Sequence, residues 1–271
     1  MEIKKILEKN NFVFKKKYGQ NFLLDQNILD NIVSLCDISK DTLIIEIGVG
    51  SANLTRKLSS FANKVLAYEI DKTLEEPLKE ILAKYNNIDI IFDDFLSRNI
   101  KEDIKKYKYD NLIVAANLPY YITTPIITKF IDEKIDVKKM VLMVQNEVAD
   151  RFSAKVKTKD YNSLTIFLNY HFNIKKAFLV SKNVFYPKPN VDSAIVVFDK
   201  KENKLFLKNE SLFLKIIKDA FKQKRKTIKN NLKCYNLDKI EGVLKKYNKS
   251  LNSRAEEITI EEFAEIANNL D

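Results

Sequence analysis

Short apolar runs alternate with amphipathic stretches from residue 41 to residue 145, and this alternation limits the possible folds. Runs rich in β-branched residues occupy positions 42–48, 64–70, 87–93, 111–117 and 138–145. Their nearly continuous apolar character is typical of strands in a parallel sheet that is covered on both faces. The stretches at 53–62, 72–85 and 125–133 have helical spacing. The alternation therefore predicts successive βα units and an open α/β sheet.

The pattern changes near residue 200. Residues 193–199 (SAIVVFD) predict a last strand, and three helical candidates follow at 211–232, 238–247 and 259–270. The last candidate opens with a capping-box pattern from Thr259 to Glu262. We therefore predict an α/β domain over residues 1–202 and a small all-helical domain over residues 203–271. A chain of 271 residues with 45% hydrophobic composition is long enough for both.

Composition argues against several kinds of site and location. His171 is the only histidine, and it falls in a helical-looking run, so a catalytic triad or a multi-histidine metal site is not indicated. Cys36 and Cys234 have no CxxC spacing, and we expect buried thiols in a reducing compartment, with no metal.

No stretch approaches eighteen apolar residues, and the amino terminus lacks the pattern of a signal peptide. We expect a cytoplasmic protein without membrane contact.

The net charge of +10, from 47 Lys and Arg against 37 Asp and Glu, favours a polyanionic partner such as nucleic acid. Lysine-rich composition can also reflect genome bias, so the placement of the charge matters. Near the amino terminus, lysines are interleaved with aromatic residues at Phe12, Phe14, Lys15, Lys16 and Lys17.

A second basic region lies on the predicted helix from residue 211. Lysines at helical spacing follow one side of it, at Lys222, Lys226, Lys229 and Lys233. Lys224 and Arg225 widen this charged side, and Phe221, Ile228 and Leu232 fall on another. A solvated lysine face is the alternative interpretation.

Two glycines follow the first predicted strand. The strand ends at Glu46 and Ile47, and Gly48 and Gly50 form a turn into the next helix. Glycines at this position allow the backbone to approach a ligand closely, with a helix N-terminus behind it. Residue 53 is Asn, so the third glycine of the dinucleotide fingerprint is missing. A plain tight βα turn is the alternative.

The next two predicted strands end in acidic residues. Glu69 lies twenty-one residues after Gly48, where an acidic side chain can accept both hydroxyl groups of an adenosine ribose. Asp94, beside Phe95, is placed to accept the amino group of an adenine, although it can equally be a turn-forming aspartate. Because the carboxyl ends of parallel strands share one edge, these groups predict a crevice for an adenosine compound without a pyrophosphate.

The fourth predicted strand ends in a rigid aromatic loop rather than a turn of small residues. The loop contains Asn117, Leu118, Pro119, Tyr120 and Tyr121. The amide can accept a hydrogen bond from an exocyclic amine, and the backbone before the proline can offer a carbonyl beside it. A tyrosine ring can stack against a nucleobase.

These motifs resemble the ribosomal RNA adenine dimethyltransferases. The similar segments are KKKYGQNFLLDQNIL (15–29), EIGVGSANLT (46–55), NLPYYITTP (117–125), FYPKPNVDSAIV (185–196) and AFKQKRKTIKNNL (220–232). They cover nearly the whole chain in the family's order. The chain departs from the family at Val49, where proline is common, and at Ala52, where many members have glycine.

The resemblance implies a Rossmann-like class I methyltransferase sheet, with the small helical domain as an RNA-binding domain. It implies S-adenosylmethionine as the cofactor and adenine N6 as the methylated atom. Within the family, YGQNFL and QKRKTIKNNL look like the small-subunit branch. The implied substrate is a pair of neighbouring adenines in a hairpin near the 3′ end of 16S rRNA, within an immature small subunit. A monomer is expected.

The resemblance also implies roles for individual residues. Asn117 and Leu118 would accept hydrogen bonds from adenine N6, Pro119 would keep their backbone rigid, and Tyr120 and Phe185 would hold the flipped ring by stacking. For Phe185, a core aromatic residue before a proline turn is the alternative. The implied cofactor-binding residues are Asn21, Leu23, Gly48, Gly50, Glu69, Asp94 and Asn117. Without the resemblance, Asn21 and Leu23 would be read as a turn residue and a core leucine.

Other functions remain open at this level. A 23S rRNA adenine methyltransferase of the antibiotic-resistance type, or more distantly a DNA adenine methyltransferase, would share the motifs. A non-catalytic assembly or transcription factor could keep the fold, although the intact segment 117–120 and Glu69 argue against it. The missing glycine and the aromatic loop argue against a nicotinamide dehydrogenase.

Overall fold

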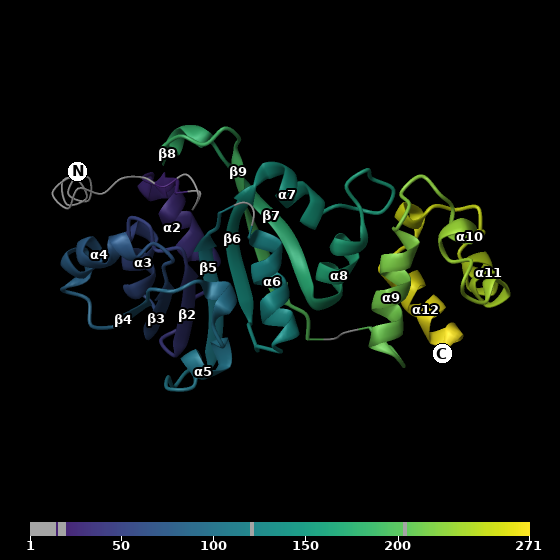
Figure 1. Cartoon of the computed structure of the whole chain (residues 1–271), viewed down its shortest axis with the longest axis horizontal. Helices are drawn as coiled ribbons and strands as arrows, with labels where there is room; N and C mark the ends of the chain where they lie inside the picture. The colour runs from purple at the N-terminus through teal and green to yellow at the C-terminus, as the bar shows by residue number, and fades with distance from the viewer. Residues whose placement is uncertain (1–14, 16–19, 120–121, 203–204) are drawn as a thin grey trace. The chain divides into compact units, whose positions relative to one another are not determined.

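The computed structural model describes residues 15, 20–119, 122–202 and 205–271. These residues form two compact units, and the chain passes between them more than once (Figure 1). The first unit holds the described residues up to Ala149 together with Lys175–Asp199, and the second holds Asp150–Ile174 together with the described residues from Lys200 to Asp271. The last crossing, after Asp199, lies close to the boundary that the sequence predicts. Residues 150–174 differ from that prediction, because they belong to the helical unit.

A twisted sheet of seven strands forms the centre of the α/β unit within the described residues. Its order is β4-β3-β2-β5-β6-β9-β7. The first five of these are parallel, and β9 pairs antiparallel with β6. The bounds are β2 (Thr42–Ile47), β3 (Lys64–Tyr68), β4 (Ile88–Ile91), β5 (Asn111–Asn117), β6 (Lys139–Gln145), β7 (Phe172–Val180) and β9 (Ser193–Lys200). The chain runs outward from β2 to β4 and then returns to β5 on the other side of β2, as in doubly wound folds.

All six strands that the sequence predicts are present, with small differences at their ends. The sequence does not predict β7, whose residues are mostly half-exposed or exposed, or the antiparallel direction of β9. An edge strand that carries Asn173, Lys175 and Lys176 lacks the continuous apolar run that identifies a buried parallel strand.

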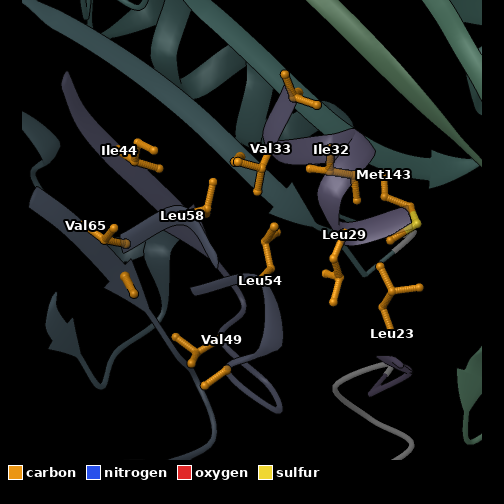
Figure 2. Packing of buried hydrophobic residues seen from close by; sticks show 14 of the residues in the cluster. Leu23, Leu29, Ile32, Val33, Ile44, Val49, Leu54, Leu58, Val65 and Met143 are labelled. Atoms are coloured by element: carbon orange, nitrogen blue, oxygen red, sulfur yellow. The ribbon is translucent and has the colours of Figure 1, made fainter. Parts of the chain in front are cut away.

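Helices cover both faces of the sheet. On one face, α2 (Gln26–Leu35), α3 (Asn53–Ser59) and α4 (Glu75–Leu82) pack against alternate strand residues such as Ile44 and Val65 (Figure 2). On the other face, Tyr68 contacts Phe95 of the 3₁₀ turn η3 (Phe95–Ser97), with ring centroids 5.0 Å apart. Phe95 in turn contacts Phe130 of α6 (Thr123–Asp132). Burial on both faces is the reason that these strands read as continuous apolar runs.

A short antiparallel ribbon joins two segments that are far apart in sequence. β1 (Phe22–Leu23) pairs with β8 (Phe185–Tyr186), and the Leu24 amide donates a further hydrogen bond to the Val184 carbonyl, 3.2 Å away. The sequence does not predict this ribbon, because two-residue strands have too few residues for a periodic signal. It brings the amino-terminal segment next to the segment that precedes β9.

The second unit is helical. The core contains Phe213, Ile217 and Phe263, and the predicted capping box is present, since Thr259 Oγ1 accepts the Glu262 amide at 3.2 Å. The main helices are α8 (Ser163–His171), α9 (Glu210–Ala220), α10 (Ile228–Asn231), α11 (Leu237–Lys246) and α12 (Ile260–Leu270), with α7 (Asn146–Phe152) leading into this unit. The last two confirm the helices predicted at 238–247 and 259–270.

The prediction of one helix over residues 211–232 is wrong. The helix α9 ends at Ala220, and a non-helical loop precedes the short α10. Asn231 Nδ2 donates to the carbonyls of Ala220 and Gln223, at 2.6 and 3.1 Å, so its side chain satisfies carbonyls that a continuing helix would use. Lys222 and Lys226 therefore lie in a loop, and the lysines do not form one side of a helix.

Other sequence predictions are resolved by burial. Cys36 is buried, and burial raises the pKa of its thiol to about 12. Cys234 is exposed, so the expectation of two buried thiols is wrong for this residue.

Across the described ranges, no helix has the length and apolar character that crossing a bilayer requires. The same residues contain no group of three or more His, Cys, Asp or Glu side chains arranged to hold a metal ion.

Candidate cofactor site and catalytic loop

A cavity of about 260 Å³ lies at the carboxyl ends of β2, β3 and β5. Ligands of open α/β sheets bind at this place, where the strand order reverses between β2 and β5. Its walls come from the segment around β1, the glycine turn, the end of β3 and the loop after β5. The cavity is lined by Gln20, Asn21, Phe22, Leu23, Leu29, Glu46, Gly48, Val49, Gly50, Ser51, Asn53, Leu54, Glu69, Ile70, Asn117, Leu118 and Pro119.

The two glycines of the turn have left-handed backbone conformations, with φ of +85° at Gly48 and +53° at Gly50. A β-carbon on Gly50 would lie 3.0 Å from Cε1 of Phe22, which also lines the cavity. Ala52 adopts φ of +58°, a value that favours glycine, while Val49 and Ala52 are both buried in the core. The turn therefore keeps left-handed conformations at Gly48 and Gly50 with valine at position 49 and alanine at position 52.

Glu69 ties the end of β3 to the glycine turn. Its Oε2 accepts the Gly50 amide at 3.0 Å, and its Oε1 accepts the Asp71 amide at 2.9 Å. The side chain is only 5% exposed, and this burial raises its pKa although the two amides oppose the rise. Each carboxylate oxygen can accept more than one hydrogen bond, so Glu69 retains capacity for ligand hydroxyl groups.

Glu46 is a cavity residue that the sequence analysis did not select. It is the second-to-last residue of β2, is 1% exposed, and its Oε2 has no hydrogen-bond partner among the described residues. Burial raises the pKa of Glu46 to about 8; the Thr55 hydroxyl opposes this rise and the Glu69 carboxylate adds to it. A carboxylate is rarely buried without a partner, so Glu46 marks a place for a proton donor or a cation. The signal in the sequence is a single charged residue within an apolar strand, directly before the glycine turn.

Asn117 and Leu118 hold the loop after β5 against two neighbouring segments. Asn117 Nδ2 donates to the Asn21 carbonyl at 3.0 Å, and the Leu118 amide donates to the Met143 carbonyl at 3.3 Å. The Asn117 amide oxygen is thereby kept as an acceptor at the cavity wall. Pro119 also lines the cavity, whereas Tyr120 and Tyr121 lie outside the described residues.

Asn21 and Leu23 belong to the same wall. The Leu23 carbonyl accepts Asn53 Nδ2 at 2.9 Å, which links this segment to the start of α3. Gln20 and Ile70 line the cavity as well, and the sequence analysis missed both. Ile70 directly follows the strand-end carboxylate, and this adjacency is the signal that could have identified it.

Lys15 and Gln20 anchor the amino-terminal segment to Asp71. Lys15 Nζ lies 2.6 Å from Asp71 Oδ1, and Gln20 Nε2 donates to Asp71 Oδ2 at 2.8 Å. Burial alone would raise the pKa of Asp71, but the hydrogen bonds from Lys15, Thr73 and Gln20 lower it. Lys15 therefore pairs with a carboxylate of the protein, and RNA binding by the lysines at 15–17 stays a prediction. Phe12, Phe14, Lys16 and Lys17 lie outside the described residues.

Two predicted site residues are not among those that line the cavity. Asp94 is exposed at the end of β4, where its Oδ1 accepts the Leu96 amide at 2.9 Å and caps η3. Phe185 is 5% exposed and lies opposite Leu23 in the β1–β8 ribbon, within the hydrophobic core. These contacts are those of a turn-forming aspartate and a core aromatic residue, and the ligand roles of both side chains stay predictions.

The sequence is similar to ribosomal RNA methyltransferases over almost its full length. The family model described as ribosomal RNA adenine dimethylase matches residues 11–271. A ribosomal RNA small subunit methyltransferase A from Alkaliphilus oremlandii (strain OhILAs) is 44% identical over 273 residues, covering 98% of this chain and 95% of the relative. Its counterpart from Clostridium botulinum (strain Okra / Type B1) is 39% identical over 270 residues, covering 98% of both chains.

Two solved structures have a similar fold. The dimethyladenosine transferase from Plasmodium falciparum has a TM-score of 0.76 and 29% identity, with 90% of this chain and 95% of that chain covered. The 23S rRNA methyltransferase ErmE has a TM-score of 0.75 and 24% identity, with coverage of 93% and 100%. At that identity, the second likeness concerns the fold alone.

Proposed function

The chain belongs to the ribosomal RNA adenine dimethylase family, and we propose that it methylates N6 of two adjacent adenines in a hairpin near the 3′ end of 16S rRNA. The proposed methyl donor is S-adenosylmethionine, and the proposed carrier of the RNA is an immature small subunit in the cytoplasm, on which the enzyme acts as a monomer. The observation that supports this best is the cavity of about 260 Å³, which brings the Glu69–Gly50 pair and the Asn117 loop to one edge of the sheet.

The residues that line the cavity fit S-adenosylmethionine. Glu69 is a buried acceptor that suits the ribose hydroxyl groups, and the conformations of Gly48 and Gly50 allow close approach of a ligand. The unpartnered Oε2 of Glu46 suits a ligand that carries positive charge, since the cofactor has a sulfonium and an ammonium group. Asn21 and Leu23 would close the wall over its methionine part, and Asp94 would accept the adenine amino group. The cofactor supplies an electrophilic methyl group with a neutral thioether as the leaving group.

The loop after β5 would orient the nucleophile. Adenine N6 is a poor nucleophile because its lone pair is delocalised into the ring. In the first transfer, two hydrogen bonds from N6, to the Asn117 amide oxygen and the Leu118 carbonyl, would favour a pyramidal nitrogen and free the lone pair for an in-line displacement. In the second transfer, the monomethylated nitrogen has one N–H left and would donate one of these bonds. Asn117 is already oriented for this, because its Nδ2 is held by the Asn21 carbonyl at 3.0 Å. After transfer, N6 loses one of its protons to water, so no strong base is required.

The target base must leave its hairpin stack to reach the loop. Tyr120 would stack against the ring, while Pro119 keeps the backbone of the loop rigid. We retain Phe185 as the second stacking residue. Its ring is 5% exposed, so the contact requires a local shift of the β1–β8 ribbon when RNA binds.

The α/β unit would be the methyltransferase domain and the helical unit the RNA-binding domain. Several exposed cations of the helical unit have no carboxylate partner within the described residues: Lys222, Arg225, Lys226, Lys229 and Lys233. By contrast, Lys249, which follows α11 in sequence, lies 2.6 Å from Glu262 Oε2. Cations without partners in the protein suit the phosphates of RNA, and such binding weakens steeply with salt.

One experiment tests the proposal. Small and large ribosomal subunits from cells that lack dimethyladenine are incubated separately with the purified protein and methyl-labelled S-adenosylmethionine, and the RNA is digested for mass spectrometry. We expect two neighbouring dimethyladenines near the 3′ end of 16S rRNA and no label in the large subunit. Label confined to 23S rRNA would identify the antibiotic-resistance type of activity, and the absence of label from both subunits would contradict a methyltransferase function.

A further inference from the structure

Asp71 is a buried carboxylate beside the cavity that the sequence analysis did not select. It directly follows Glu69 and Ile70, which line the cavity, but it is not itself among the described residues that do so. Its side chain is only 1% exposed. A carboxylate is seldom buried to this extent unless the protein supplies donors for it. The donors of Asp71 therefore indicate what this residue holds in place.

Three hydrogen bonds form a closed ring between Asp71 and the amino-terminal segment. Lys15 Nζ donates to Asp71 Oδ1 at 2.6 Å, and Gln20 Nε2 donates to Asp71 Oδ2 at 2.8 Å. The Lys15 backbone amide completes the ring by donating to Gln20 Oε1 at 2.7 Å. Both ends of the Gln20 side-chain amide are thus engaged, and its direction at the cavity wall is fixed.

The backbone of Asp71 contacts a second part of the cavity. Its amide donates to Glu69 Oε1 at 2.9 Å, while Glu69 Oε2 accepts the Gly50 amide at 3.0 Å. Asp71 therefore orients Glu69 with its backbone and Gln20 with its carboxylate. Glu69 is the proposed acceptor for the ribose, and residues 20–23 form the wall proposed for the methionine part. One residue thus connects the two halves of the cofactor site.

The tie to Asp71 differs from two other ties of the same wall. Asn117 Nδ2 donates to the Asn21 carbonyl at 3.0 Å, and Asn53 Nδ2 donates to the Leu23 carbonyl at 2.9 Å. Both of these join neutral groups and hold main-chain carbonyls. Hydrogen bonds with an ionised member are about twice as strong as neutral ones. The carboxylate of Asp71 therefore gives this wall its strongest side-chain contact among the three.

We infer that Asp71 is a positioning residue for the cofactor, whose carboxylate holds the Gln20 part of the wall in place for the methionine part of S-adenosylmethionine. This inference rests on the proposed function, which supplies the cofactor. Asp71 would not contact the cofactor and would act through Gln20. Its loss should therefore weaken ligands that carry the amino-acid part more than ligands that consist of the adenosine part alone.

Isothermal titration calorimetry with two ligands tests this difference. S-adenosylhomocysteine carries both parts of the cofactor, whereas 5′-methylthioadenosine lacks the amino-acid part. Asp71→Asn removes the charge but keeps the backbone amide that Glu69 accepts. We expect the affinity for S-adenosylhomocysteine to fall about tenfold, because charged hydrogen bonds are lost, and the affinity for 5′-methylthioadenosine to change by less than about twofold.

Lys15→Met tests the same tie from its other end. Asp71 also caps the 3₁₀ turn η2 (Lys72–Leu74) by accepting the Thr73 amide at 3.1 Å, so Asp71→Asn alone changes two features. Lys15→Met should lower the affinity for S-adenosylhomocysteine by a similar factor. The double variant should bind no more weakly than the weaker single variant, because both changes break one tie. Lys15→Arg should keep most of the affinity, since a guanidinium also donates to a carboxylate.

Two controls remove comparable interactions away from the cavity. Lys57→Met breaks the ion pair that joins α3 to Asp30 of α2. Asn99→Ala removes the cap of α5 (Ile100–Ile104), where Asn99 Oδ1 accepts the Glu102 amide at 3.3 Å. Both variants should bind the two ligands as the unaltered protein does, even if the lost cap lowers the midpoint of thermal unfolding. The titrations contain no RNA, so a contribution of Lys15 to RNA binding does not enter them.

The outcomes separate this inference from the proposed function. If the unaltered protein binds neither ligand, the proposed cofactor fails first. If it binds S-adenosylhomocysteine and Asp71→Asn binds that ligand equally well, the inference is overturned while the proposed function stands. Equal weakening of both ligands would also overturn it, because a general loosening of the site would then explain the loss. Circular dichroism confirms that each variant is folded.

Discussion

The Asn117 side chain donates a hydrogen bond from Nδ2 to the Asn21 carbonyl, 3.0 Å away. This contact joins the end of β5 to the segment that leads into β1, although the two residues are 96 positions apart. Because Nδ2 is engaged in this contact, the amide oxygen is the atom of the Asn117 side chain that remains to accept a hydrogen bond at the cavity. One side chain thus closes the cavity wall and also prepares the acceptor that adenine N6 would use.

Asn117→Ala should lower the single-turnover rate of methyl transfer by about 10²–10³, because it removes the acceptor that orients N6. Asn117→Asp is the informative companion variant, since it keeps an acceptor oxygen and replaces the donor to the Asn21 carbonyl with a second oxygen. We expect it to fall between the alanine variant and the unaltered protein. A rate for Asn117→Ala within threefold of the unaltered protein would contradict the mechanism.

Glu69→Gln should weaken S-adenosylmethionine binding by about 10- to 100-fold, because hydrogen bonds to charged groups contribute about 1.5–3 kcal/mol. Glu69 now accepts hydrogen bonds from the backbone N–H groups of Gly50 and Asp71. The NH2 group of glutamine would face one of these two donors and could not accept its hydrogen bond. Isothermal titration calorimetry measures the affinity. Glu76→Gln, at an exposed position of α4, is the control and should bind normally; equal affinities for the two variants would exclude Glu69 from the site.

Glu46→Gln should change how stability depends on pH. The pKa of Glu46 is about 8 in the folded protein, whereas an unfolded glutamate titrates near 4.3. Between these values the folded state holds a proton that the unfolded state has released, so raising the pH favours unfolding. The loss is about 1.4 kcal/mol for each unit of difference in pKa, and it is complete above about pH 8.

The variant with glutamine has no such proton, so its stability should fall less between pH 5 and pH 8. Urea denaturation of both proteins at several pH values measures the difference in slope. The glutamine can carry its own pH-independent penalty as a buried amide, and therefore the slopes are compared rather than the absolute free energies. Parallel curves for the two proteins would show that Glu46 ionises normally.

Gly50→Ala should destabilise the protein by about 1–3 kcal/mol, because φ is +53° and the added β-carbon would lie 3.0 Å from the Phe22 ring. It should also weaken cofactor binding, since both residues line the cavity. Gly242→Ala is the matched control. This glycine lies inside α11 with open space around it, so alanine should stabilise the protein by about 0.5–1 kcal/mol. Chemical denaturation decides whether the two changes have opposite signs.

Much of the α/β unit was predictable, because the central parallel strands β2, β3, β5 and β6 are buried and therefore have a continuous apolar signal. The same logic placed Gly48, Gly50, Glu69 and Asn117 at one edge of the sheet, where the structure has the cavity. The β1–β8 ribbon was not predictable from periodicity, because two-residue strands carry none. The ribbon is nevertheless what gives Asn21 and Leu23 their place in the wall.

The errors have physical causes. The helix predicted over 211–232 is interrupted because Asn231 caps the carbonyls at the end of α9, a contact that no helical spacing reveals. The sequence analysis did not anticipate that Lys15 pairs with Asp71, because the two residues lie 56 positions apart. Glu46 was not selected because a single carboxylate inside a strand looks like any other strand residue, and only the structure shows that it is buried with its Oε2 lacking a hydrogen-bond partner among the described residues.

The pairing of β1 with β8 has a consequence for synthesis of the protein. Residues 22–23 form one strand of this ribbon and residues 185–186 the other, so translation makes one edge of the cavity long before the strand that supports it. A nascent chain that has not yet released residues 185–186 from the ribosome cannot have formed this ribbon. The cavity-lining segment at residues 22–23 therefore gains its partner strand late in translation, after the central strands of the sheet have already emerged.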